Sequence, residues 1–297
     1  MERNFVSWIL KSLTKSPRSV IGNGDDAAVI ETREMSTLVA TDMLLDDVHF
    51  LSQEISPEFI GRKAVAVNFS DIAAMGGAPT GVFVSLALPE NSDPIWIKRL
   101  LMGAQELSKA FGCGIDGGDT NSWSGQLVVN VCVTGRPHWR GPVTRSGAQE
   151  GDAIMLTGSA LGGSLPSGHH ATFTPRLAEV EWILDRFPIS SMIDLSDGLS
   201  TDANHLASAS KKKFILDRQA ITRFEPGTRE FNSVFCDGED FELLFTCSKS
   251  IAKELEMTFP WPCGIRNIGT VDSGVGVFLR HKDKADLTTV EFSGYEH

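Results

Sequence analysis

The sequence predicts a mixed α/β (α+β) protein with two domains. Short apolar runs typical of strands alternate with longer amphipathic segments typical of helices. The length of 297 residues suits two domains of ordinary size. The composition changes between residues 135 and 151, where residues typical of a linker gather: Arg136, Pro137, Gly141 and Pro142. We therefore expect an N-terminal domain of residues 1–137 and a C-terminal α/β domain of residues 146–297, with a linker at about 138–145.

In the N-terminal half, turn residues and apolar runs alternate. The N-terminus looks like an amphipathic helix without a signal-peptide cleavage region. The elements expected after it are an acidic turn at 22–26, strands at 27–30 and 38–42, a long helix from Ser56, a strand at 81–88, a helix at 94–111, a tight turn at 117–120 and a strand at 126–134.

The long helix has clear start and stop signals. Ser56 is suited to cap it, Pro57 suits its first position, and the glycine pair at 76–77 ends it. A narrow stripe along this helix carries Ile60, Ala64, Val67 and Asp71. A carboxylate therefore enters the core side, where it needs hydrogen-bond donors, a cation or a metal. Local backbone N–H groups are the ordinary alternative for a lone aspartate.

The C-terminal half continues the alternation. Its expected elements are a strand at 153–157, a glycine-rich stretch at 158–168, a helix at 175–187, a strand ending at 193–198 that turns into a helix with Asp202 and His205, a strand at 241–247 and strands within 265–297. The glycine-rich stretch contains no lysine, so the sequence does not predict a Walker-type ATPase.

Composition limits the possible partners and the compartment. Asp and Glu outnumber Lys and Arg by 38 to 27, and a net charge of −11 disfavours nucleic acid. Small phosphorylated ligands remain possible when divalent cations mediate. Five scattered cysteines without C-x-x-C spacing predict reduced thiols in a cytoplasmic protein, with neither disulfides nor a zinc site. The longest apolar run, near 82–88, is too short to span a membrane.

Carboxylates at strand ends and glycine turns form the pattern that carries chemistry: Asp25, Asp26, Asp42, Asp119, Asp194 and Asp197, joined by Asp71 of the helix. Each alone is ordinary turn chemistry. Together, hard oxygen ligands without a His/Cys cluster suit Mg²⁺ bound with substrate phosphates. Arg145 adds a possible bidentate phosphate contact. Lys63 is a weaker candidate, because surface lysines are common.

Several motifs resemble the thiamine-monophosphate kinase family of the aminoimidazole-ribonucleotide-synthetase-like superfamily. They are GDDAAV (24–29), ATDMLLDDVHF (40–50), GRKAVAVNFSDIAAMGGAP (61–79), GGDT (117–120), RSGAQEGD (145–152), IDLSDGLSTD (193–202), DGEDFELLF (237–245) and FSGYEH (292–297). They cover most of the chain in the family's order. The resemblance implies ATP- and Mg²⁺-dependent γ-phosphoryl transfer to thiamine monophosphate, giving thiamine diphosphate. It also implies a homodimer formed through the N-terminal sheets, with active sites between the halves.

The resemblance also assigns roles to individual residues. The family's metal positions correspond to Asp26, Thr41, Asp42, Asp71, Asp119, Asp194 and Asp197. Its ATP contacts correspond to Gly118, Asp119, Arg145 and Ser196, and its substrate contacts to His49, Glu239 and the stacking aromatic Phe292. Without the resemblance, His49 and Phe292 read as ordinary surface or core residues, and Glu239 as a turn carboxylate. No residue is assigned as a general base, because the acceptor phosphate is already ionised near neutral pH.

The chain departs from the family pattern at three places. The segment 163–175 is shorter than in the family and is expected to miss one of its helices, the family's GG-E-D-Y reads DGEDF at 237–241, and Asn121 and Ser122 follow the GGDT motif. These differences concern substrate affinity more than the reaction.

Other readings remain open. A different enzyme of the superfamily would act on another small phosphorylated or carboxylated substrate. Selenophosphate synthetase would need a reactive residue near the N-terminus, whereas the first cysteine here is Cys113, and the hydrogenase-maturation relative would end in a cysteine-bearing tail. The purine-pathway members share the fold without His49 and Phe292 in these contexts. A non-catalytic nucleotide-binding homologue is the alternative from a different class.

Overall fold

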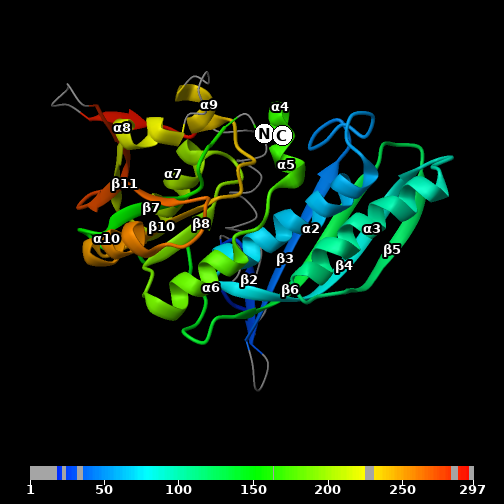
Figure 1. Ribbon diagram of the computed structural model, residues 1–297, viewed down its shortest axis with the longest axis horizontal. Helices are drawn as coiled ribbons and strands as arrows, with labels where there is room; N and C mark the ends of the chain where they lie inside the picture. The colour runs from blue at the N-terminus through cyan, green and yellow to red at the C-terminus, as the bar shows by residue number, and fades with distance from the viewer. Residues whose placement is uncertain are drawn as a thin grey trace. The chain divides into compact units, whose positions relative to one another are not determined.

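The computed structural model describes residues 19–21, 25–31, 36–162, 164–224, 231–281 and 287–293. The chain divides into two compact units, and the main boundary between them lies between Arg140 and Gly141 (Figure 1). The segment Ala171–Leu177, which the sequence placed in the second domain, belongs to the first unit. The expected N-terminal helix lies outside the described residues. No helix among those residues is long and apolar enough to cross a membrane.

The first unit contains a six-stranded sheet in the order β1-β2-β3-β6-β4-β5. Its strands are β1 Ser19–Ile21, β2 Ala28–Glu31, β3 Ser36–Leu45, β4 Gly77–Pro89, β5 Ile115–Trp123 and β6 Val128–Pro137, and its helices are α2 Pro57–Ala74 and α3 Pro94–Ala110. All neighbouring strands are antiparallel except β4 and β5. Helices α2 and α3 lie side by side on one face of the sheet (Figure 1).

The alternation of side chains along the strands gives this sheet two different faces. Leu44, Val84 and Val131 belong to its buried apolar set. Met43 and Phe83 are 55% and 41% exposed. The sheet therefore presents large apolar side chains on the face opposite its buried core.

Helix α2 is buried on most of its circumference, so the narrow stripe predicted from the sequence was too narrow. Ala66 and Phe69 are as buried as Ile60 and Ala64. Ser56 occupies the N-cap position, but its side chain makes no capping hydrogen bond. The helix ends before the glycine pair as expected, and the second glycine begins β4.

Two glycines bring the backbones of α2 and α3 into direct contact. A Cβ atom on Gly61 would lie 1.9 Å from the carbonyl oxygen of Leu100 in α3. A Cβ atom on Gly103 would lie 1.9 Å from the carbonyl oxygen of Glu58 in α2. Neither position has room for a side chain. Each helix therefore packs its backbone directly against a glycine of the other, at two contacts that we call the reciprocal glycine notches.

The tight turn predicted at 117–120 is wrong, because these residues lie within β5. Strand β5 is an exposed edge strand that pairs in parallel with β4. Gly118 has φ +155°, and a Cβ there would lie 1.8 Å from the carbonyl oxygen of Val84. The glycines thus serve close backbone approach to β4 and do not form a turn.

The second unit is built on a seven-stranded sheet in the order β13-β12-β9-β11-β7-β10-β8. Its strands are β7 Ala153–Thr157, β8 Ser191–Asp194, β9 Lys213–Asp217, β10 Leu243–Cys247, β11 Ile265–Asp272, β12 Gly276–Arg280 and β13 Thr288–Val290. Its longer helices are α6 Leu177–Arg186, α7 Leu199–Ser210 and α10 Lys249–Thr258, with shorter helices at α8 Arg218–Ile221, η1 Thr222–Phe224 and α9 Phe231–Cys236.

Strands β7, β8 and β10 are buried along their whole lengths. Alternate residues such as Leu156, Ile193 and Leu244 enter one core with α7, α8 and α9. Burial on both faces explains why these strands read as nearly continuous apolar runs in the sequence. The segment 163–175, expected to be shorter than in the family, contains two four-residue helices, α4 Ser164–Ser167 and α5 His169–Thr172.

Candidate functional site

The first unit brings together the carboxylates of Asp26, Asp42 and Asp71. Asp26 lies two residues before β2. Asp42 lies within β3, which runs beyond the strand end predicted at residue 42, and Asp71 lies in the last turn of α2. Carboxylate oxygens of Asp26 and Asp71 lie within 4.8 Å of each other. Asp71 also shares a side-chain hydrogen bond with Asp42. Three separate elements therefore place acidic groups at one point.

The electrostatics of this group favour a cation. Burial raises the pKa of Asp42 above its ordinary value, and the charge of Asp26 raises it further, while the hydrogen bond with Asp71 opposes the rise. Clustered carboxylates of this kind require a shared proton or a positive charge. Hard oxygen donors without sulfur or imidazole are the donors that Mg²⁺ prefers, so these residues fit the ion that the sequence predicted.

Thr41 does not join this group through its side chain. Successive side chains of a strand point to opposite faces, so the hydroxyl of Thr41 faces away from the carboxylate of Asp42. Its Oγ1 donates to the carbonyl oxygen of Val131 at 3.0 Å. The Thr41 hydroxyl is therefore not placed to bind a metal beside the Asp42 carboxylate.

Asp119 is separated from the acidic group within the sheet. Asp42 pairs with Val131, and Val131 pairs with Val84 of β4. Val84 pairs with Gly118, the residue before Asp119. Three strand spacings place Asp119 about 14 Å from Asp42. The exposed carboxylate of Asp119 accepts hydrogen bonds from the Thr120 backbone nitrogen at 2.8 Å and from Asn121 Nδ2 at 3.0 Å.

His49 is held in one orientation by the loop that follows β3. Its Nδ1 accepts a hydrogen bond from the Leu45 backbone nitrogen at 3.0 Å, so the neutral ring carries its proton on Nε2. Lys63 Nζ donates to the carbonyl oxygen of His49 at 2.6 Å. Lys63 is fully buried, which corrects the expectation of a surface lysine. Its role in the fold is to anchor the His49 loop to α2.

In the second unit, two loops carrying predicted site residues are joined by a hydrogen-bond ladder. The backbone nitrogen of Glu239 donates to the carbonyl oxygen of Ser196 at 2.8 Å. Phe241 donates to Leu195 at 2.8 Å, and Leu195 donates to Glu242 at 2.8 Å. The loop after β8, predicted to contact metal and ATP, is therefore fixed directly beside the loop predicted to contact the substrate.

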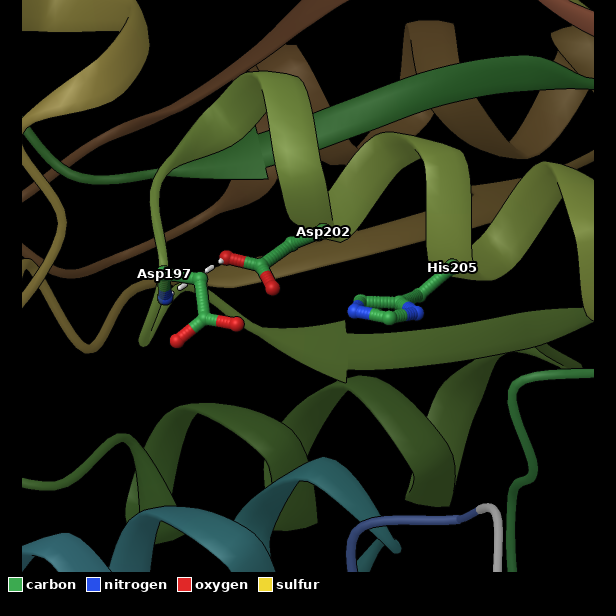
Figure 2. A group of neighbouring side chains, drawn as sticks. All are labelled: Asp197, Asp202 and His205. Atoms are coloured by element: carbon green, nitrogen blue, oxygen red, sulfur yellow. Dashed lines mark hydrogen bonds between the residues drawn. The ribbon is translucent and has the colours of Figure 1, made fainter. Parts of the chain in front are cut away.

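Asp197 lies at the start of α7 in a turn that Asp202 holds in place. Asp202 Oδ2 accepts from the backbone nitrogens of Asp197 at 3.2 Å and Gly198 at 3.1 Å. His205 lies on the same side of α7 (Figure 2). One carboxylate oxygen each of Asp197 and Asp202 and one ring nitrogen of His205 lie within 4.8 Å of one another. Asp202 is only 1% exposed, so it acts as an internal brace for the turn.

Phe292 lies beside α7. Its ring meets the His205 ring edge to face, with 5.4 Å between the ring centroids. The Phe292 side chain is nevertheless 41% exposed, which leaves ring surface accessible for stacking.

The predicted nucleotide-binding residues Gly118 and Arg145 lie in different units, Gly118 in the first and Arg145 in the second. Gly118 lies in β5, and a side chain there would clash with β4. Arg145 is half-buried, and its carbonyl oxygen accepts from Ser210 Oγ at 3.1 Å. The same hydroxyl accepts from the Ala148 backbone nitrogen at 3.1 Å, which fixes the segment after the unit boundary to the end of α7.

The structure adds polar residues that the sequence reasoning did not assign to the site. Asp202 and His205 were placed on the helix but given no role, although their spacing of three residues puts them on one helix face. His170 was not noticed, because its partner Glu239 is 69 positions away and only the fold brings them together.

Comparison with known proteins gives a consistent result. Residues 24–136 match the family described as AIR synthase related protein, N-terminal domain. The chain is 33% identical to the thiamine-monophosphate kinase of Rhodopirellula baltica, covering 94% of this chain and 92% of the relative. It is 35% identical to that of Bacillus subtilis, covering 93% of each.

A solved structure supports the same placement. The chain superposes on AaThiL complexed with AMPPCP and TMP with a TM-score of 0.79 and 28% identity, covering 97% of this chain and 96% of the other. The expected two-domain fold is thereby confirmed, and the identity over nearly the full length of the relatives decides the family. The chain belongs to the thiamine-monophosphate kinase family.

Proposed function

We propose that this protein transfers the γ-phosphoryl group of ATP to thiamine monophosphate in a Mg²⁺-dependent reaction. The bond between the γ-phosphorus and the β,γ-bridging oxygen breaks, and a bond forms between that phosphorus and a phosphate oxygen of thiamine monophosphate. The products are ADP and thiamine diphosphate. The carboxylate group of Asp26, Asp42 and Asp71, in a chain of this family, is the observation that carries the proposal.

The residues proposed to hold Mg²⁺ are Asp26, Asp42, Asp71, Asp119, Asp194, Asp197 and the backbone of Thr41. When bound, Mg²⁺ supplies neutralisation of the phosphate charges that otherwise keep the two reactants apart. Asp194 ends β8 and Asp197 follows three residues later, so both are fixed by the same strand end. Within each unit, these acidic side chains favour the binding of cations.

Arg145, Gly118 and Ser196 are proposed to contact the nucleotide. Arg145 offers a planar pair of donors for phosphate oxygens. Gly118 allows close approach because it lacks a side chain. No general base is required, because the acceptor phosphate is already ionised near neutral pH.

His49, Glu239 and Phe292 are proposed to bind thiamine monophosphate. The accessible ring of Phe292 suits stacking on a cationic heterocycle. The carboxylate of Glu239 suits the positive charge and the amino group of the thiamine half. His49 presents Nε2–H as a donor. These contacts orient the acceptor and exclude other phosphates by shape and charge.

We also propose that two copies associate through the sheets of their first units. Met43 and Phe83 expose apolar surface on the sheet face that the helices leave uncovered. The distance between Asp119 and Asp42 within one sheet suits a site completed by a second chain.

All five cysteines are free thiols, which supports a cytoplasmic location.

The direct test is an assay of the purified protein with ATP, Mg²⁺ and thiamine monophosphate, scored for thiamine diphosphate by chromatography. We expect product formation that stops on chelation, and no product when free thiamine replaces the monophosphate. ATP consumption with other small phosphates but none with thiamine monophosphate would favour a different enzyme of the superfamily. ATP binding without turnover of any acceptor would favour a non-catalytic homologue.

A further inference from the structure

A buried histidine lies against the proposed substrate residue Glu239. His170 Nδ1 is 3.4 Å from Glu239 Oε2. The His170 side chain is 3% exposed and that of Glu239 is 10% exposed. A carboxylate with so little contact with water depends on the protein groups around it for its orientation.

The backbone that carries Glu239 is strained and firmly held. Glu239 has φ +56° and Phe241 has φ +51°, in the left-handed region that residues other than glycine rarely adopt. A Cβ on Gly238 would lie 2.7 Å from the carbonyl oxygen of Ser196. Such strain persists only where surrounding contacts determine it, and it clusters at functional sites.

Buried hydrogen bonds determine the conformation of this loop. Both carboxylate oxygens of Asp240 accept from the Gly162 backbone nitrogen, at 2.8 and 3.0 Å. Glu242 Oε2 accepts from Thr157 Oγ1 at 2.6 Å. The main chain at Glu239 is thus fixed by its neighbours, and His170 contacts its carboxylate.

We propose that His170 is a positioning residue for substrate recognition: it holds the Glu239 carboxylate in the orientation that receives the cationic heterocycle of the substrate. This inference rests on the proposed function. It assigns recognition of the thiamine half to a His170–Glu239 pair and leaves phosphoryl transfer to the acidic residues. His170 itself touches neither reactant.

Three variants of the full-length protein test the proposal. His170→Leu removes the imidazole at similar volume. His170→Asn keeps an N–H donor near the position of Nδ1. His169→Leu is the matched control, because His169 lies in the same short helix but is exposed. We expect His170→Leu to raise the KM for thiamine monophosphate about 10- to 100-fold, with the KM for ATP unchanged and kcat changed little.

His170→Asn should restore most of the lost affinity, and His169→Leu should behave as wild type. Calorimetric titration with thiamine monophosphate provides a readout that is independent of turnover. Equal KM values for thiamine monophosphate in wild type and His170→Leu, or equal effects on thiamine monophosphate and ATP, overturn the proposal.

A double-mutant cycle covers the case in which His170→Leu fails to fold. If His170 acts through Glu239, His170→Ala, which removes the imidazole, combined with Glu239→Gln raises KM no further than Glu239→Gln alone. Additive effects overturn the pairing. A wild-type protein that makes no thiamine diphosphate overturns the proposed function and this inference together, whereas an active wild type with a neutral His170→Leu overturns this inference alone.

Discussion

The Asp71→Asn variant should stabilise the metal-free protein while it abolishes activity. The Asp71 carboxylate lies within 4.8 Å of that of Asp26. Two unit charges at 4.8 Å repel by about 0.9 kcal/mol at the dielectric constant of water and by about 3.5 kcal/mol at an effective value of about 20. Both side chains are half-buried, so we expect a gain of about 1–2 kcal/mol. The new amide can still donate a hydrogen bond to Asp42.

Thermal unfolding in chelator and in Mg²⁺ measures this effect. A gain of about 1–2 kcal/mol corresponds to a rise in Tm of roughly 2–8 °C in chelator. Mg²⁺ should raise the Tm of the wild type by binding the folded state, and it should raise that of the variant less.

The matched control is Glu106→Gln, which removes one negative charge from an exposed position on α3. It should change neither the Tm in chelator nor the response to Mg²⁺. A lower Tm for Asp71→Asn in chelator, or an undiminished Mg²⁺ response, would refute the assignment of Asp71 to a cation site.

Three further predictions concern other parts of the chain. Asp202→Ala should lower stability by about 2–4 kcal/mol, because two backbone N–H groups lose a charged acceptor, and Asp202→Asn should recover part of this in denaturant titration. The hydrogen bond from Arg99 lowers the pKa of Glu58 from 4.5 to about 2, so the contact contributes stability above pH 4.5 and loses it as the pH falls towards 2. An NMR titration should show the Glu58 midpoint well below 4.5, returning towards it in Arg99→Gln, and unchanged midpoints would contradict the contact. Burial raises the pKa of the Cys247 thiol to about 12, so alkylation at pH 8 should require unfolding, and rapid labelling of the native protein at this thiol would be inconsistent with the structure.

Much of the fold was predictable because local signals and tertiary structure agree. The strand at 153–157 and the helices beginning at Pro57 and Pro94 follow from apolar runs and from proline at the first helical turn. The error at 117–120 has a physical cause. Glycine marks both turns and close strand approach, and only the neighbouring backbone of β4 distinguishes the two.

The candidate site was predictable in its residue types but not in its grouping. The sequence indicated Asp26, Asp42 and Asp71 as acidic positions, and the fold brings all three together in the first unit. It gave no sign that Asp119 lies three strand spacings away from Asp42. Buried partners are the hardest to predict, since Lys63 looks like any surface lysine until its burial is seen.

The reciprocal glycine notches between α2 and α3 have a consequence for ligand binding. With backbone against backbone at Gly61 and Gly103, α2 cannot roll or slide on its neighbour without atomic overlap. The carboxylate of Asp71, a proposed metal ligand at the end of α2, is therefore preorganised for an ion. Little conformational entropy remains to be lost when the ion binds. A substitution as small as Gly61→Ala should therefore lower the affinity for Mg²⁺, although it changes none of the proposed metal ligands.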